Sequence, residues 1–113
     1  MKEPFVFLTH VTECIEKIEE YTASLSKDQF LAHSQVQDAV LRRLEIIGEA
    51  IKNLPAGFVK KYPDVPWSAI VRTRDKLIHG YFGIDLNFTW EVLQHDIPSL
   101  KEKIQRILTE LKH

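Results

Sequence analysis

The chain has 113 residues, of which 44% are hydrophobic and 27% are charged, with a formal net charge of −1 and a single cysteine. This length predicts one domain spanning residues 1–113. The near-neutral charge argues against a strongly basic nucleic-acid coat, so any RNA contact must come from local clusters of Arg and Lys. One cysteine permits no intrachain disulfide, and no apolar run approaches the ~20 residues of a membrane span, so we expect a cytoplasmic protein.

The N-terminal half of the chain carries helix signals. Apolar residues spaced by three and four predict a first helix over residues 6–23. Ser26-Lys27-Asp28-Gln29 has the form of a capping box and predicts a short helix to about residue 32. Ser34-Gln35-Val36-Gln37 repeats that form and predicts a long helix to about residue 53. Gly48 lies inside this long helix, which indicates a close approach by a neighbouring helix.

The C-terminal half continues in the same way. A proline-rich loop at 62–66 precedes a helix that is expected to begin near Trp67 and end near Gly80. Asp85 is expected to cap a further helix, and Asp96 to open the last one with Pro98 in its first turn. The sequence therefore predicts an all-α, up-and-down bundle of four main helices plus short extra helices.

The segment from residue 74 to residue 81 carries the residues with chemical potential. Arg74 can fork two hydrogen bonds onto phosphate oxygens. His79 can give or take a proton near neutral pH, and Tyr81 adds a phenol. Asp75 lies one helical turn before His79 and is expected to orient its ring. Together these side chains suggest a site that handles a phosphate.

The spacing of Arg74 and His79 restricts how they can meet. In a regular helix, residues five apart lie ~140° apart around the axis and ~7.5 Å apart along it. The two side chains therefore do not meet on a straight helix. Either the helix is distorted or ends near His79, or both side chains line a groove shared with another subunit.

A longer stretch, residues 67–85, resembles the signature region of HepT-like proteins of the HEPN superfamily. The motif of that family, Arg-x4-His-x-Tyr, is matched by Arg74, His79 and Tyr81, with Asp75 where the family often has Asn. Two other stretches, residues 43–50 and Trp90 with residues 96–100, are also similar to the family. The resemblance thus covers most of the chain.

The resemblance implies a HEPN-like homodimer that acts as a metal-independent endoribonuclease toxin of a type VII-like toxin–antitoxin pair, without a cofactor. The family suggests RNA, in particular tRNA, as the substrate. Arg74 and His79 of both subunits would line a cleft at the dimer interface. An MntA-type nucleotidyltransferase antitoxin would neutralise the toxin by transferring AMP from ATP onto Tyr81.

Two other functions remain open at the level of sequence. The chain can instead be a non-catalytic helical partner or regulatory subunit of a minimal nucleotidyltransferase, a reading that the near-neutral charge favours. Alternatively, the motif only forms salt bridges between the helices of a structural bundle. In the ribonuclease reading, His79 is the acid or base, Arg74 stabilises charge on the phosphate and Asp75 orients one of them.

Other polar and aromatic residues are assigned plainer roles. We expect Trp67 and Trp90 in the core or an interface, and Cys14 in a structural role. Glu49 is expected to be solvated, with a pairing to Arg74 or Arg72 as the alternative. The remaining histidines and several cations are expected on the surface, the cations with RNA backbone contact as a second option: His10, His33, His95, His113, Arg42, Arg43, Lys60 and Lys61.

Overall fold

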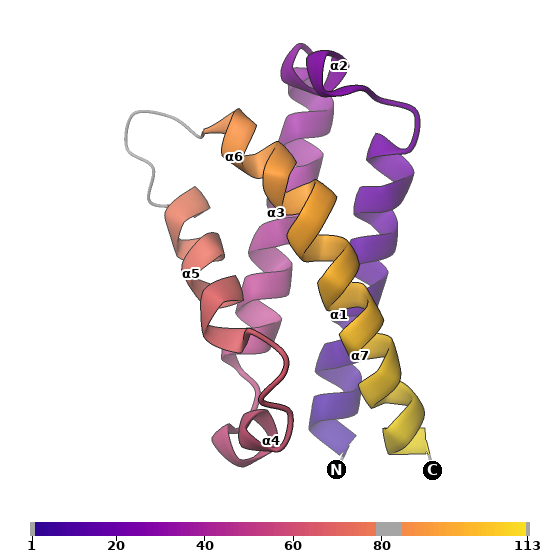
Figure 1. Cartoon of the computed structure of the whole chain (residues 1–113), viewed down its shortest axis with the longest axis vertical. Helices are drawn as coiled ribbons and strands as arrows, with labels where there is room; N and C mark the ends of the chain where they lie inside the picture. Colours follow the sequence, from indigo (N-terminus) through magenta and orange to yellow (C-terminus); the bar gives the residue numbers. More distant parts are fainter. Residues whose placement is uncertain (1, 79–84, 113) are drawn as a thin grey trace.

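The computed structural model of the chain describes residues 2–78 and 85–112. Within these ranges the chain is helical and contains no strand. Four long helices and several short ones follow one another (Figure 1): α1 (Lys2–Thr22), α2 (Lys27–Leu31), α3 (Ser34–Lys52), α4 (Ala56–Lys61), α5 (Trp67–Ile78), α6 (Leu86–Glu91), the π-helical turn η1 (Val92–Asp96) and α7 (Ile97–Lys112). The predicted all-α architecture is confirmed.

The four long helices run alternately up and down (Figure 1). Helix α1 packs against α3 and α7, and α3 packs against α5 on its other side. The short helix α2 lies at one end of the bundle beside α6, whereas α4 lies at the opposite end, where both termini are found. None of the helices within residues 2–78 and 85–112 has the length and apolar character needed to cross a membrane.

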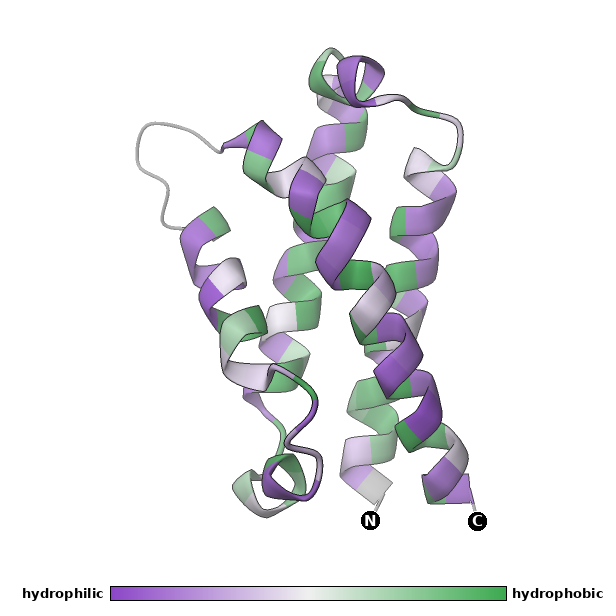
Figure 2. Ribbon diagram, viewed as in Figure 1, coloured by the Kyte–Doolittle hydropathy of each residue, from purple (hydrophilic) through white to green (hydrophobic). Residues whose placement is uncertain are grey.

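The core forms where the apolar stripes of the long helices meet, and Figure 2 shows hydrophobic residues concentrated on their inward faces. Each stripe follows the spacing of three and four that predicted the helix, because only that spacing keeps side chains on one helical face. The buried Leu, Ile and Val residues of the three longest helices are Leu8, Val11, Ile15 and Ile18 on α1, Val40, Leu44, Ile47 and Ile51 on α3, and Ile97, Leu100, Ile104 and Ile107 on α7.

Side-chain caps fix where the shorter helices begin. The capping box at Ser26 is present: its Oγ accepts from the Gln29 amide at 3.2 Å, and the Ser26 amide donates to Gln29 Oε1 at 2.9 Å. Asp85 caps α6 by accepting from the Phe88 amide at 3.0 Å. The second predicted box was wrong by one residue, because His33 rather than Ser34 caps α3, its Nδ1 accepting from the Val36 amide at 3.3 Å.

Asp96 does not open a new helix, so that prediction was wrong. Helix α6 runs without a break through the π-helical turn η1, which ends at Asp96, into α7. Pro98 is the second residue of α7, where its ring would press on the carbonyl four residues earlier in a tight α-helix. The wider π turn directly before Pro98 relieves this conflict and lets the helix continue.

Candidate active site

Arg74 lies on the face of α5 that packs against α3, directly opposite Gly48. A Cβ atom added to Gly48 would collide with Cβ and Cγ of Arg74. The glycine therefore provides the space through which the aliphatic part of the arginine crosses α3. This is the close helix approach that an interior glycine predicted.

Two carboxylates hold the Arg74 guanidinium group. Its Nη2 donates to Oε1 of Glu49 on α3, and its Nη1 donates to Oδ1 of Asp75 at 2.8 Å. The Arg74 side chain is 15% exposed, whereas the Glu49 and Asp75 side chains are 47% and 45% exposed. The preference for a solvated, unpaired Glu49 was wrong, because Gly48 lets α5 come close enough for Arg74 to reach Glu49.

This geometry leaves part of the guanidinium group without a partner. Nε of Arg74 is buried and makes no hydrogen bond to any of the residues that the structure describes. An arginine keeps its charge at any physiological pH. A single permanent cation is thus fixed between two half-exposed carboxylates, and its orientation is set by charge-assisted hydrogen bonds.

Asp75 and Arg74 are therefore brought together, whereas the other two predicted site residues cannot be placed. His79 and Tyr81 lie outside the described residues, which end at Ile78 on this side and resume at Asp85. The predicted contact of Asp75 with His79 thus remains a prediction. The contact that the structure shows for Asp75 is the hydrogen bond that it accepts from Arg74.

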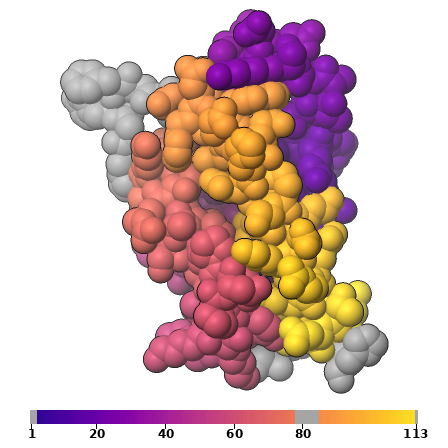
Figure 3. All heavy atoms as spheres, in the orientation of Figure 1, coloured from indigo at the N-terminus to yellow at the C-terminus, as the bar shows by residue number. Residues whose placement is uncertain are grey.

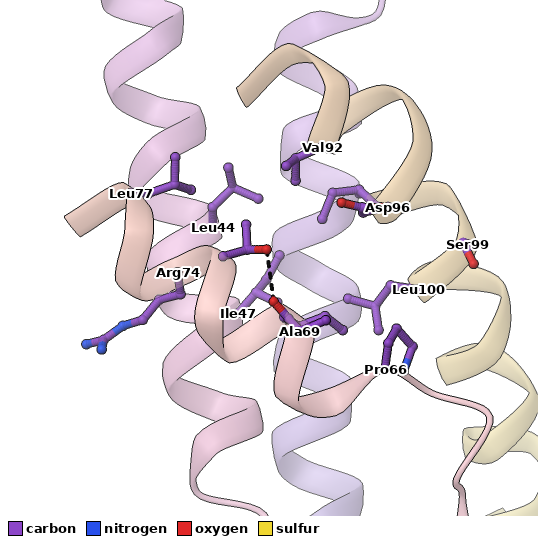
Figure 4. Close-up of a pocket in the computed structure, with 13 residues that line it drawn as sticks. Leu44, Ile47, Pro66, Ala69, Arg74, Leu77, Val92, Asp96, Ser99 and Leu100 are labelled. Atoms are coloured by element: carbon purple, nitrogen blue, oxygen red, sulfur yellow. Dashed lines mark hydrogen bonds between the residues drawn. The ribbon is translucent and has the colours of Figure 1, made fainter. Parts of the chain in front are cut away.

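An apolar pocket of about 190 Å³ lies on the other side of α5, between α3, η1 and α7. Leu44, Ile47, Leu77 and Leu100 form much of its wall (Figure 4). The guanidinium group of Arg74 points away from this pocket. The carboxylate-bound end of Arg74 and the pocket therefore belong to opposite sides of the helix.

The aromatic residues, Cys14 and three of the histidines lie where the sequence predicted. Trp67 is buried and donates from Nε1 to the Tyr62 carbonyl at 3.0 Å, and Trp90 packs on Phe30 with ring centroids 5.3 Å apart. Cys14 is buried. Three histidines are exposed, whereas the fourth surface prediction, His113, falls outside the described residues; the three are His10, His33 and His95.

Arg43 differs from its prediction as a surface charge. It is partly buried, and its Nη1 lies 3.9 Å from Sγ of Cys14. Its hydrogen bonds to Cys14 and then to Tyr21 raise the pKa of the Arg43 guanidinium above the ordinary value. In the described ranges, no three His, Cys, Asp or Glu side chains gather as ligands for a metal ion.

The helical domain matches a family of known proteins along most of its length. The family model described as ribonuclease HepT-like matches residues 11–107. This range includes Gly48, Glu49 and the whole motif from Arg74 to Tyr81. The chain belongs to the ribonuclease HepT-like family.

Named relatives agree with this assignment. "Probable ribonuclease HepT" of Thermococcus cleftensis is 46% identical over 101 residues, covering 89% of this chain and 92% of the relative. A protein of Caldanaerobacter subterraneus named as an RNase is 40% identical over 112 residues, covering 99% of this chain and 100% of the relative. No solved structure matches the chain.

A further relative is longer than this chain. It is a Methanocaldococcus jannaschii protein whose name pairs a gamma-glutamylcyclotransferase with an RNase. It is 53% identical over 110 residues, which cover 97% of this chain and 50% of the relative. The chain thus spans half the length of this relative.

Proposed function

We propose that the chain is a metal-independent endoribonuclease that uses Arg74 and His79 to cleave RNA, with Asp75 orienting the arginine. Membership of the ribonuclease HepT-like family supports the class of activity. The observation that carries the residue assignment is the Arg74 clamp, by which we mean Arg74 with its partners Glu49 and Asp75. Desolvation of a partly buried ion pair can cancel its attraction, so the clamp is better explained by the position it gives Arg74 than by stability.

The reaction needs no nucleophile from the protein, because RNA supplies its own 2′-hydroxyl group. The 2′ oxygen attacks the adjacent phosphorus while the bond from phosphorus to the 5′ oxygen breaks. A base removes the 2′ proton and an acid protonates the departing 5′ oxygen, which leaves a 2′,3′-cyclic phosphate and a 5′-hydroxyl end. His79 serves as acid or base, and Arg74 stabilises the negative charge that builds on the phosphate oxygens.

The biological setting in this proposal follows the family resemblance. The chain acts as a homodimer whose two Arg-x4-His motifs share a cleft, as the toxin of a type VII-like pair in the cytoplasm. Transfer RNA is the substrate, and an MntA-type nucleotidyltransferase silences the toxin by adding AMP to Tyr81. The added phosphate and adenosine would compete with RNA for Arg74.

A second function, a non-catalytic partner subunit of a nucleotidyltransferase, has one structural observation in its favour. Both nitrogens at the tip of the Arg74 guanidinium group are already bound to carboxylates. An RNA phosphate must share or displace at least one of these partners. In the partner-subunit reading the clamp is simply a bond between α3 and α5.

A cleavage assay in EDTA separates the two functions. Unmodified protein, checked by mass, is incubated with tRNA and total RNA beside Arg74→Ala and His79→Ala. We expect cleavage by the wild type and a loss of at least a hundredfold in both variants, since each removes a group used in the transition state. No cleavage by folded, unmodified wild type would reject the ribonuclease and favour the partner subunit.

A further inference from the structure

A hollow without any negative charge lies where the end of α3, the short helix α4 and the start of α5 meet. Its volume is about 470 Å³. Three charged residues line it, and all are cations: Lys52 on α3, Lys60 on α4 and Arg72 on α5. The rest of its lining is apolar or uncharged and consists of Ile51, Leu54, Ala56, Val59, Trp67, Ser68 and Val71.

A second hollow of about 410 Å³ adjoins the first and shares Val59, Trp67, Ser68 and Arg72 with it. Arg72 is the only charged residue that lines this second hollow. We call the two together the basic hollow. It concentrates positive charge in a chain whose net charge is −1.

The cations of the basic hollow are available to a ligand. Lys52, Lys60 and Arg72 are all exposed. Throughout residues 2–78 and 85–112, none of the three has a carboxylate within 4.0 Å of its charged nitrogens. By contrast, both terminal nitrogens of Arg74 donate to carboxylates, those of Glu49 and Asp75.

The basic hollow and the Arg74 clamp lie along the same faces of α3 and α5. On α5, Ser68, Arg72 and Asp75 follow the spacing of four and three that keeps side chains on one helical face. On α3, Glu49 and Lys52 are three residues apart and face the same way. Each step of three residues is ~4.5 Å along a helix, so the hollow begins about one turn from the clamp.

We propose that the basic hollow binds the phosphodiester backbone of an RNA strand next to the phosphate held at Arg74. This inference rests on the proposed ribonuclease function and adds where the substrate gains its affinity. The two carboxylates of the clamp outnumber its one cation and repel a polyanion. Cations one turn away, without carboxylates of their own, supply the attraction that the clamp lacks. The Lys and Arg stems can lie on the apolar floor while their charged ends meet phosphate.

The test compares two triple variants that remove the same charge. Lys52→Gln, Lys60→Gln and Arg72→Gln are combined in one protein. The matched control combines Lys27→Gln, Arg106→Gln and Lys112→Gln, which are exposed and lie outside the basic hollow. Circular dichroism checks that both remain helical. Binding is measured on a fully 2′-O-methylated single-stranded oligonucleotide, which lacks the nucleophile and so cannot be cleaved.

We expect the hollow variant to bind this oligonucleotide at least tenfold more weakly than the control variant. Log affinity falls as log salt rises, and the magnitude of this slope should be smaller for the hollow variant by ~0.7 for each phosphate contact that is lost. An RNA dinucleotide has a single phosphodiester group, which Arg74 would hold, and so offers no second phosphate to the basic hollow. The hollow variant should therefore lose less kcat/KM on the dinucleotide than on a long RNA. The KM for a long RNA should rise in parallel with the loss of binding.

Equal oligonucleotide binding by the two triple variants would overturn the proposal. So would loss of binding to an MntA-type nucleotidyltransferase with RNA binding unchanged, because the basic hollow would then face a protein. If the wild type cleaves no RNA but only the hollow variant loses oligonucleotide binding, the ribonuclease proposal fails and the backbone site stands.

Discussion

At the scale of single residues, the Arg74 clamp depends on a glycine and a glutamate that are adjacent in the chain. Gly48 removes the side chain that would block Arg74, and Glu49 then receives its guanidinium group. The sequence indicated the close approach at Gly48, and it offered the pairing of Glu49 with Arg74 or Arg72 only as the alternative to a solvated Glu49. The choice between these alternatives could not be made from the chain alone, because it depends on which residue of α5 crosses α3 at that height.

The first prediction concerns Glu49→Gln. The amide keeps the shape but removes the charge that orients Arg74, and a charge-assisted hydrogen bond contributes ~1.5–3 kcal/mol. If this hydrogen bond holds Arg74 in place in the transition state, its loss should lower kcat for RNA cleavage by about tenfold or more. KM should stay level or fall, because a negative charge near the RNA is lost.

Glu45→Gln is the control for this experiment. Glu45 lies one turn earlier on α3, and its ion-pair partner in the described part of the chain is exposed Arg42, at 3.5 Å. Its variant should keep both kcat and KM, since exposed pairs contribute little. If Glu49→Gln and Glu45→Gln gave the same kcat, Glu49 would have no role in positioning Arg74.

The second prediction concerns Tyr62 and alkaline pH. Burial, and next the charge of Glu110, raise the pKa of Tyr62 above the ordinary tyrosine value. The folded protein therefore holds this proton more tightly than the unfolded chain. The contribution of the protonated Tyr62 hydroxyl to the free energy of unfolding is complete below about pH 10. It is lost as the pH rises through the raised pKa of Tyr62.

Tyr62→Phe tests the direction of this effect. The ring that packs on Phe58, with centroids 5.1 Å apart and planes tilted by 50°, is retained, while the titrating hydroxyl group is removed. Urea unfolding of both proteins is measured from pH 8 to pH 11. The wild type should lose more stability than the variant above about pH 10. Parallel stability curves over this range would contradict the assignment.

At the scale of elements, the sequence predicted helices and caps correctly where a single local signal was present. It was wrong at Asp96, where a cap signal competed with continuation of the helix. The apolar stripes predicted every long helix, and Ser26 and Asp85 were identified as caps from their local sequence. Asp96 resembled a cap because a proline follows two residues later. The structure continues the helix instead, since η1 accommodates Pro98 and keeps Val92, Leu93 and Ile97 buried.

The third prediction is that Gly48→Ala destabilises the packing of α3 on α5. Alanine is intrinsically better in a helix by about 1 kcal/mol. Its Cβ would nevertheless overlap Cβ and Cγ of Arg74, so the helices must separate or the arginine must leave. Overpacking of this kind costs ~1–3 kcal/mol, so the free energy of unfolding should fall despite the better propensity.

Gly57→Ala on α4 is the matched control, because nothing lies within 4 Å of its added Cβ. This variant should be neutral or slightly stabilising in the same thermal or urea unfolding experiment. A Gly48→Ala protein as stable as the Gly57→Ala protein would show that α3 and α5 are not closely packed at Gly48. RNA cleavage by Gly48→Ala should fall as well, since the same overlap displaces Arg74.

At the scale of the whole molecule, one core joins the helices, and the space-filling view shows α5, α6 and α7 covering one face of it (Figure 3). Ile104 on α7 is a fully buried member of this core. The clamp and the basic hollow both lie along the α3–α5 pair, and within the described ranges no residue of α7 pairs with Arg74 or lines the basic hollow. Substitutions in α7 should therefore affect stability without touching the proposed site.

The fourth prediction follows from that arrangement. Ile104→Ala should lower the free energy of unfolding by ~2–5 kcal/mol through lost burial and the cavity left behind. Unfolding should remain a single transition by circular dichroism and tryptophan fluorescence, because one core serves the whole domain. RNA cleavage measured well below the melting temperature should be unchanged. Two separate transitions would contradict a single cooperative domain.

The sequence by itself determined the fold class, the helices and the residue types of the Arg-x4-His-x-Tyr motif. These features are local: periodicity, caps and the spacing of Arg74, His79 and Tyr81 are all properties of nearby residues. The tertiary structure decided which side chains from different helices meet. Glu49 meets Arg74, and Lys52, Lys60 and Arg72 gather in one hollow, because the packing distance and rotation of α3 against α5 are set by the whole core. No local pattern specifies that rotation.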